Sequence, residues 1–134
     1  FGLPRIVSTA ADLRAIFDAV PERENGLTFC AGSLGSRDDN DLPAILAEHL
    51  DRVHFVHLRN VSTDPDGSFT EDDHLTGNAD MVRLIALLLG EEARRREGGR
   101  GDASIPFRPD HGHLLLDDQA KETLPGYSAI GRLK

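Results

Sequence analysis

The sequence predicts an α/β protein with parallel strands. Segments in which apolar residues recur at helical spacing alternate with three short apolar runs, at residues 27–30, 53–58 and 105–107. Each run is short and mostly apolar, as expected of a parallel strand that is covered on both faces. Each run also ends beside side chains that can bind a metal or transfer a proton. Three such strand ends suggest one shared site.

The first helix is predicted to begin near Thr9, because Asp12 follows three residues later in the order of a capping box. Its inner face is then formed by Leu13, Ile16, Phe17 and Val20. Pro21 ends the element. The first strand follows at 27–30, and the small residues at 31–36 predict a flexible loop.

The second helix is predicted to begin at the capping residues 39–41, with Pro43 in its first turn. Its inner face consists of Ile45, Leu46 and Leu50. The strand at 53–58 comes next. The polar segment 61–76 is too long for a routine connection, and loops of that length often act as lids or binding loops.

The last part of the chain is predicted to contain one more helix and one more strand. The helix covers 81–89 and the strand covers 105–107. Between them, the charged and glycine-rich segment 94–102 predicts a solvated helix end followed by a mobile linker.

This alternation fits the C-terminal part of a (β/α)8 TIM barrel, in which functional residues stand at the C-terminal ends of the strands. A complete barrel needs about 250 residues, whereas this chain has 134. We therefore expect residues 1–134 to be a single domain within a longer protein. Neither G-x-G-x-x-G nor G-x-x-x-x-G-K-[ST] occurs, which disfavours the nucleotide-binding α/β folds.

The composition limits which partners the protein can bind and which cellular compartment it fits. With 15 Lys+Arg against 23 Asp+Glu the net charge is −8, which argues against a nucleic acid or an anionic membrane as partner. One cysteine excludes an internal disulfide and fits a reducing compartment. No apolar run approaches the roughly 20 residues of a membrane span, and no signal peptide is expected at the first residues. We expect a cytoplasmic protein.

Three residues could bind a metal together. Cys30, His57 and Asp110 offer a thiolate, an imidazole and a carboxylate, and their separations of 27 and 53 residues correspond to one or two βα units. The mixed set suits Fe(II), Mn(II) or Zn(II) better than Mg or Ca. A lone cysteine is more often a small apolar residue, and His54 competes with His57. Since the two histidines fall on opposite faces of a strand, only one should enter the site, and His57 lies nearer the strand end.

Candidates for proton transfer follow the last strand. His111 is adjacent to Asp110, and an imidazole changes charge near neutral pH. In an extended segment, His111 and His113 share a face opposite Asp110, and His113 is either a supporting or a capping residue. Tyr127 stands at a predicted helix start, where an ordinary surface tyrosine is the simpler interpretation.

Candidates for substrate binding follow the first two strands. Arg59 and Asn60 suit a carboxylate and hydroxyl groups. The loop that contains Ser33 and Gly35 could bind an oxyanion through its backbone N–H groups, or be an ordinary connection. His74 could reach the site from the long loop, although a solvated side chain is the simpler interpretation.

Four ordered motifs, at 28–35, 54–60, 108–113 and 125–133, resemble the mannonate dehydratase family, which belongs to the xylose-isomerase-like barrel group. The resemblance covers the whole chain. It implies conversion of D-mannonate to 2-dehydro-3-deoxy-D-gluconate and water in hexuronate catabolism, with Fe(II) or Mn(II) as cofactor.

By the same resemblance, the metal ligands are Cys30, His57 and Asp110. His111 and Tyr127 become the acid/base pair and Arg59 a substrate contact. The family has a further histidine ligand on an earlier strand, which would precede the segment 2–5.

Two other readings remain open at the level of sequence. A metal-dependent sugar isomerase would use the same barrel and similar ligands. A non-catalytic barrel fragment would need a partner chain or a second copy, because three parallel strands leave open edges and apolar faces. We therefore expect a homo-oligomer that binds a small sugar acid.

Overall fold

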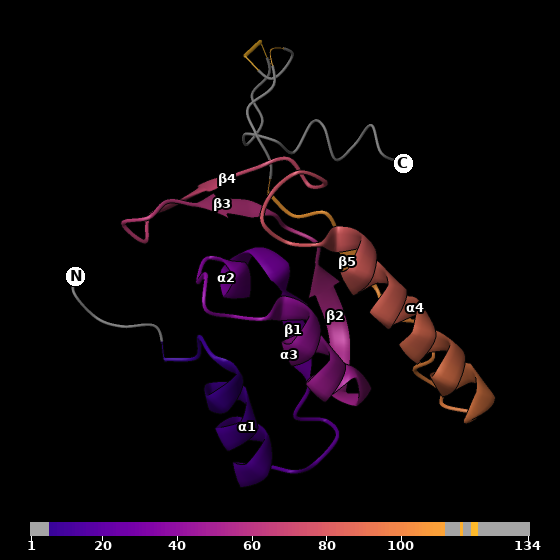
Figure 1. Cartoon of the computed structure of the whole chain (residues 1–134). Coiled ribbons are helices and arrows are strands. Elements are labelled where there is room, and N and C mark those ends of the chain that lie inside the picture. The colour runs from indigo at the N-terminus through magenta and orange to yellow at the C-terminus, as the bar shows by residue number, and fades with distance from the viewer. Residues whose placement is uncertain (1–5, 112–115, 117–118, 121–134) are drawn as a thin grey trace.

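A three-stranded parallel sheet forms the centre of the fold in the computed structural model, which describes residues 6–111, 116, 119 and 120 (Figure 1). The strands are β1 (Leu27–Cys30), β2 (Val53–His57) and β5 (Phe107–Arg108), in the order β1-β2-β5. The predicted α/β fold with parallel strands is confirmed.

The register of the sheet brings the three C-terminal strand ends to one edge. Cys30 pairs with His57, and His57 pairs with Arg108. The last residues of β1 and β2 are therefore neighbours, and the chain leaves β5 beside them. Side chains at this edge can converge although they are far apart in the sequence.

The helices begin where the sequence predicts. Helix α1 (Ala10–Ala19) has a complete capping box between Thr9 and Asp12. Helix α3 (Leu42–His49) is capped by Asp41 and continues into a short 3-10 turn, η1 (Leu50–Arg52). Helix α4 (Met81–Glu97) is capped by Asp80. These side-chain oxygens accept backbone N–H groups that have no partner inside the helix.

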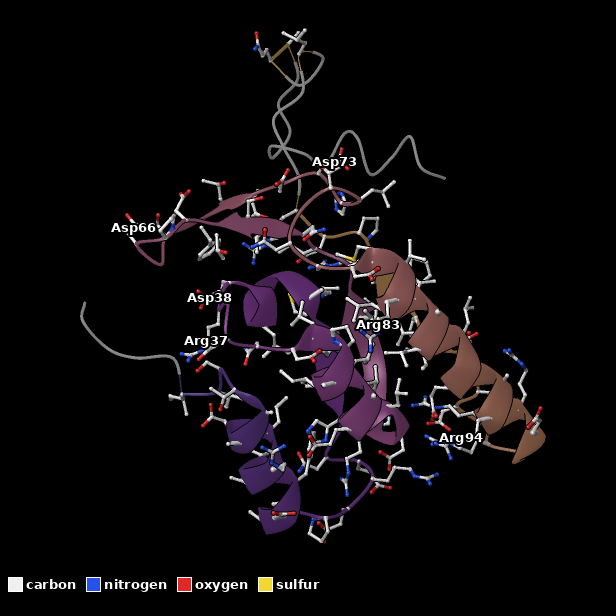
Figure 2. All side chains as sticks on the ribbon, in the orientation of Figure 1. Arg37, Asp38, Asp66, Asp73, Arg83 and Arg94 are labelled. Carbon is white, nitrogen blue, oxygen red and sulfur yellow. The ribbon has the colours of Figure 1, made fainter. Side chains whose placement is uncertain are left out.

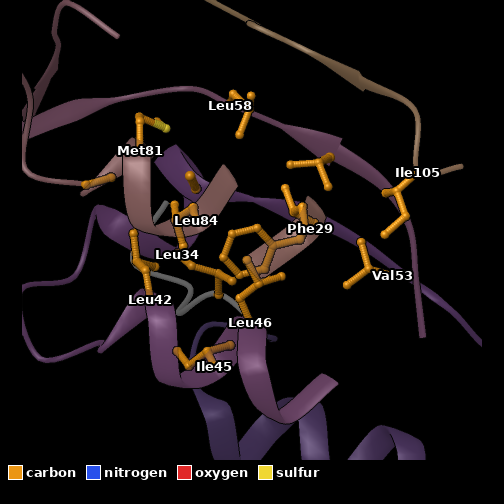
Figure 3. Close-up of a cluster of buried hydrophobic side chains, with 14 of the residues drawn as sticks. Phe29, Leu34, Leu42, Ile45, Leu46, Val53, Leu58, Met81, Leu84 and Ile105 are labelled. Atoms are coloured by element: carbon orange, nitrogen blue, oxygen red, sulfur yellow. The ribbon is translucent and has the colours of Figure 1, made fainter. Parts of the chain in front are cut away.

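The core lies between the sheet and the helices α3 and α4, which pack on each other (Figure 3). Its fully buried side chains include Phe29, Leu46, Val53, Val56 and Leu84. α1 contributes Leu13 and Phe17. None of the helices in the described part of the chain is long and apolar enough to cross a bilayer.

The predicted loop at 31–36 is instead a short helix, α2 (Ala31–Gly35). Leu34 is buried in the core, and Gly32 lies directly under the stem of Arg59. A Cβ on Gly32 would lie 2.5 Å from the Arg59 Cγ and Cδ atoms. The glycine at position 32 is thus needed for close packing, and the sequence alone does not reveal this tertiary requirement.

The predicted irregular loop at 61–76 contains an antiparallel hairpin of β3 (Val61–Thr63) and β4 (Phe69–Glu71). Its turn is closed by the Gly67 N–H, which donates to the Asp64 carbonyl over 2.9 Å, and Gly67 adopts a φ of 83°. Only glycine adopts this φ without strain. The hairpin lies beyond the end toward which β2 points, with Asp66 at its tip (Figures 1 and 2).

The helix predicted at 81–89 is longer in the structure, because α4 continues to Glu97, and the helix end predicted to be solvated at the start of 94–102 is buried at Arg95. Arg95 is 1% exposed and donates to Glu91 Oε1 over 2.7 Å. It also donates to the carbonyls of Leu50 and Val53 over 2.7 and 2.9 Å. Arg95 therefore joins α4 to the start of β2, while its neighbour Arg94 is exposed and pairs with Glu91 (Figure 2).

The last strand is shifted from the predicted 105–107 to Phe107–Arg108. Ile105 is buried in the core ahead of the strand. The Pro106 carbonyl still accepts the N–H of Val56 over 3.0 Å. Because proline has no N–H to donate, regular pairing begins only after it.

Candidate metal centre

Three potential ligands meet at the C-terminal edge of the sheet. Cys30 is the last residue of β1, His57 is the last residue of β2, and Asp110 follows β5 by two residues. One ligand atom from each lies within 4.8 Å of the others. His57 Nδ1 is 3.5 Å from Asp110 Oδ2. The structure thus brings together the three side chains that the sequence assigned to one site.

The carboxylate of Asp110 is the most constrained of the three. The residue is 3% exposed, and among the described residues its Oδ1 accepts no hydrogen bond. Arg108 Nη2 lies 2.8 Å from Oδ1 but outside the direction that a hydrogen bond requires, so the contact is an ion pair alone. The other oxygen, Oδ2, faces His57 Nδ1 at 3.5 Å. Burying a carboxylate is unfavourable unless it is paired, and a divalent cation held with Cys30 and His57 would compensate for that burial.

The chemistry of the donor set also fits a metal. A thiolate, an imidazole and a carboxylate together favour Fe(II), Mn(II) or Zn(II) over Mg or Ca. Cys30 and His57 are partly exposed, so the group can be reached from solvent. The residues present therefore fit the divalent metal that the sequence analysis expects.

The structure places His57 at this cluster, and His54 away from it. The ring of Phe55 packs edge-on against the His57 ring at a centroid distance of 5.3 Å, which restricts the rotation of the imidazole. His54 is exposed, and its Nε2 lies 3.1 Å from the Arg23 carbonyl. Gly26 leaves the space for that ring, since a Cβ there would lie 1.6 Å from it.

His111 lies beside Asp110, and not on an opposite face. The segment is not extended at this point: Asp110 has a φ of 50° and His111 a φ of 27°. His111 Nε2 lies 3.8 Å from Asp110 Oδ2, and the imidazole is half exposed. The expectation of an extended segment is wrong here. The left-handed backbone turns the imidazole toward the carboxylate, next to the candidate metal ligand.

Arg59 is held above α2 by two residues of the hairpin. Its guanidinium makes a bidentate ion pair with Glu71, in which Nε donates to Oε2 over 2.8 Å. It also lies over the Phe69 ring at 5.7 Å. The hydrogen bonds to Glu71 raise the pKa of Arg59 against the lowering effect of burial, and the charges of Glu71, Cys30 and Asp110 add to this. Arg59 is thus a fixed cation facing the candidate ligands.

Asn60 has a structural role in the described part of the chain. It is 1% exposed, and its Oδ1 accepts the N–H groups of Val61 and Ala79 over 3.0 and 2.9 Å. Its Nδ2 donates to the carbonyls of His74 and Ala79 over 3.1 and 3.2 Å. Because both ends of its amide are used in this way, Asn60 fixes the loop after the hairpin and has no free polar atom to offer a substrate within the described part of the chain.

The structure does not place the remaining candidate residues at the cluster of ligands. Ser33 and Gly35 lie in α2 and not in an open loop, and Gly35 packs against Leu42. His113 and Tyr127 lie outside the residues that the structure describes.

Sequence reasoning missed one contributor to this site and left the role of another open. Glu71 carries no signal in the sequence, because its partner Arg59 is reached only when the hairpin forms. For His74 the sequence left two alternatives, a side chain that reaches the site and a solvated one. The first applies, because its Nε2 lies 2.9 Å from the carbonyl oxygens of both Pro109 and Asp110. A histidine within an otherwise acidic segment was the only available hint.

Comparison with known proteins identifies the family of this chain. The profile of the D-mannonate dehydratase (UxuA) family matches residues 1–134. Mannonate dehydratase 2 of Agrobacterium fabrum is 59% identical over 134 residues, which is 100% of this chain and 34% of that protein. Mannonate dehydratase of Saccharophagus degradans is 56% identical over 135 residues, again 100% of this chain and 34% of that protein.

A solved structure agrees with the fold. The crystal structure of mannonate dehydratase from Streptococcus suis superposes with a TM-score of 0.76 at 34% identity, covering 95% of this chain and 34% of that one. The chain thus spans about a third of the length of the relatives that it matches. Because the family profile covers every residue, the chain belongs to the D-mannonate dehydratase (UxuA) family.

Proposed function

We propose that the protein containing this chain dehydrates D-mannonate to 2-dehydro-3-deoxy-D-gluconate and water. Its cofactor is Fe(II) or Mn(II), held by Cys30, His57 and Asp110. One observation carries this proposal: the three ligand atoms lie within 4.8 Å of one another at the C-terminal edge of a parallel sheet. Family membership supplies the substrate, a sugar acid.

The reaction removes a proton beside a carboxylate and expels the C3 hydroxyl group as water. A divalent metal, when bound, stabilises the negative charge that builds on the substrate oxygens. The residues of this chain bind the substrate and transfer the protons. Arg59, fixed by Glu71, donates to the substrate carboxylate. His111, beside Asp110, moves one proton, and Tyr127 moves the other.

The architecture proposed for the whole protein follows from the same site. Residues 1–134 form a single domain that is the C-terminal part of a (β/α)8 TIM barrel, and the rest of the protein closes the sheet. The placement of candidate ligands at the C-terminal strand ends supports the barrel. We further propose that the whole protein is a homo-oligomer. We also propose that it is cytoplasmic, because the thiol of Cys30 needs a reducing compartment.

Asp110→Asn in the whole protein tests the proposal. Asn keeps the volume but removes the negative charge that attracts the cation, so both bound metal and mannonate dehydration should be lost. Elemental analysis measures the metal, and formation of the 2-keto-3-deoxy product measures activity. Asp38→Asn, at an exposed loop position, is the matched control and should retain both.

Two results would reject parts of the proposal. Unchanged metal content in Asp110→Asn would discard the ligand assignment. Aldose–ketose interconversion by the wild-type protein, without mannonate dehydration, would favour the sugar isomerase. Absence of both activities in the metal-loaded whole protein would favour a non-catalytic role.

A further inference from the structure

We propose that His74 is a positioning residue for Asp110. Its imidazole fixes the backbone on both sides of the carboxylate and so aims that carboxylate at Cys30 and His57. This inference rests on the proposed metal site, because it concerns how one of the site's ligands is held. It assigns the loop after the β3–β4 hairpin a part in forming the site.

The contact is specific in its geometry. His74 Nε2 lies 2.9 Å from the Pro109 carbonyl oxygen and 2.9 Å from the Asp110 carbonyl oxygen. Carbonyl oxygens only accept hydrogen bonds, so Nε2 must carry the hydrogen and donate it to both. One N–H group thus binds the two peptide units that flank the Asp110 α-carbon.

The backbone at that point needs such a restraint. Asp110 and His111 both have positive φ values, 50° and 27°, in the left-handed region that residues with a Cβ rarely adopt. Strained backbone of this kind persists only where the surroundings enforce it. Without the tie, the segment would relax toward an extended conformation. The Asp110 carboxylate would then leave the position 3.5 Å from His57.

His74 is itself firmly held. Its carbonyl oxygen accepts a hydrogen bond from Nδ2 of the buried Asn60 over 3.1 Å. Its neighbourhood is apolar, with Leu58, Met81 and Pro109 lining the same pocket. Gly77 leaves room for the Asn60 amide, since a Cβ there would lie 2.5 Å from it. The loop is therefore built around Asn60, and it presents the imidazole of His74 to the Asp110 backbone.

Cobalt binding to the whole apoprotein measures the effect without relying on turnover. Co(II) bound to Cys30 gives a thiolate-to-metal absorption band that Cys30→Ser removes, so the band reports on this site alone. We compare His74→Phe, which keeps the ring without the donor, with His74→Gln, whose amide replaces the Nε2 donor. His54→Phe is the matched control, because His54 also contacts a backbone carbonyl but lies away from the ligands.

We expect the two variants of His74 to differ in their affinity for Co(II). His74→Phe should weaken Co(II) binding about 10- to 100-fold, the usual effect of removing a group that orients a metal ligand. His74→Gln should restore most of that affinity, and His54→Phe should leave it unchanged. If His74→Phe does not fold, judged by circular dichroism, His74→Asn replaces it. The Asn amide is too short to reach either carbonyl, so the same loss is expected.

Two outcomes would overturn the role of His74 alone. One is wild-type Co(II) affinity in folded His74→Phe. The other is equal weakening in His74→Phe and His74→Gln, which would indicate lost packing and not a lost hydrogen bond. A wild-type protein without a Cys30-dependent cobalt band would instead overturn the metal site, and the role of His74 with it.

Discussion

Asp110 shows how much of the site is decided at a single residue. Its chemistry is evident from the sequence, because a carboxylate between proline and histidine after a strand has little packing value. Its orientation is not evident. The ion pair with Arg108 is local, but the contact that His74 makes with the left-handed backbone of Asp110 joins segments that meet only in the folded protein.

Arg59 is the second residue whose role depends on a distant partner. The sequence predicts a cation after the second strand, but not the carboxylate of Glu71 that fixes it. Gly32 allows the Arg59 stem to pass over α2, and the charges of Cys30 and Asp110 contribute to the raised pKa of Arg59. The direction of its guanidinium, and hence its use for a substrate carboxylate, is set by the hairpin.

We expect Glu71→Gln to raise the KM for D-mannonate on the order of tenfold, with a smaller change in kcat. A charge-assisted hydrogen bond contributes about 1.5–3 kcal/mol, and losing it lets Arg59 leave its binding orientation. Steady-state kinetics of the whole protein measure the change. Asp39→Asn removes a similar bidentate partner from the exposed Arg37 and should not alter KM. An unchanged KM in Glu71→Gln would show that the hairpin does not orient Arg59 for substrate.

At the scale of elements, the sequence predicts helix starts better than helix ends. Thr9, Asp41 and Asp80 cap their helices through local hydrogen bonds that are visible as short-range patterns. The end of α4 is set by long-range contacts, because Arg95 finds carbonyl partners at Leu50 and Val53. Charge alone predicted a solvated linker there.

Arg95→Met should lower the free energy of unfolding by about 3 kcal/mol, near the lower end for a broken buried ion pair. The loss leaves Glu91 without its buried partner, although Arg94 still donates to it over 2.7 Å. The same hydrogen bonds lower the pKa of Glu91 even though burial alone would raise it. Urea unfolding of the whole protein measures the effect.

The matched control is Arg96→Met, one residue along the same helix. Arg96 is exposed and pairs with Glu92 over 3.3 Å, so its loss should cost less than about 1 kcal/mol. Equal destabilisation by the two substitutions would contradict the structural role of Arg95.

At the scale of the whole molecule, the described part of the chain has surfaces that a complete barrel would cover. Strands β1 and β5 are at the edges of the parallel sheet. Phe107 is exposed on β5, and Val82 and Leu89 are exposed on α4. These features agree with a chain that spans about a third of the length of its relatives. They also support the proposal that further strands and helices pack here.

Stability of the molecule should fall at acidic pH through His49, which packs against Phe17 of α1 at a ring distance of 5.0 Å. It is 6% exposed, and its Nε2 has no hydrogen-bond partner within the described part of the chain. Burial lowers the pKa of His49 below its usual 6.5, although Glu48 opposes the shift. The folded state therefore favours the neutral imidazole. Stability is complete above pH 6.5 and declines as pH falls toward the lowered pKa.

Urea midpoints at about pH 7.5 and pH 5.5, on either side of the ordinary histidine range, measure this effect in the whole protein. His49→Leu should show a smaller fall in stability between the two pH values than the wild type. His54→Leu replaces an exposed histidine, so the stability of this variant should fall between the two pH values as much as that of the wild type. An identical fall in His49→Leu and the wild type would rule out His49 as the source.

The sequence by itself determined the α/β class, the helix starts and the chemical types of the ligands at Cys30, His57 and Asp110. These depend on local periodicity, on capping and on side-chain chemistry. Only the tertiary structure decided that Glu71 fixes Arg59, that His74 contacts the backbone of Asp110, and that Asn60 is used inside the fold. The hairpin and the left-handed turn after β5 bring these groups together through contacts between residues distant in the chain, and short-range patterns do not encode such contacts.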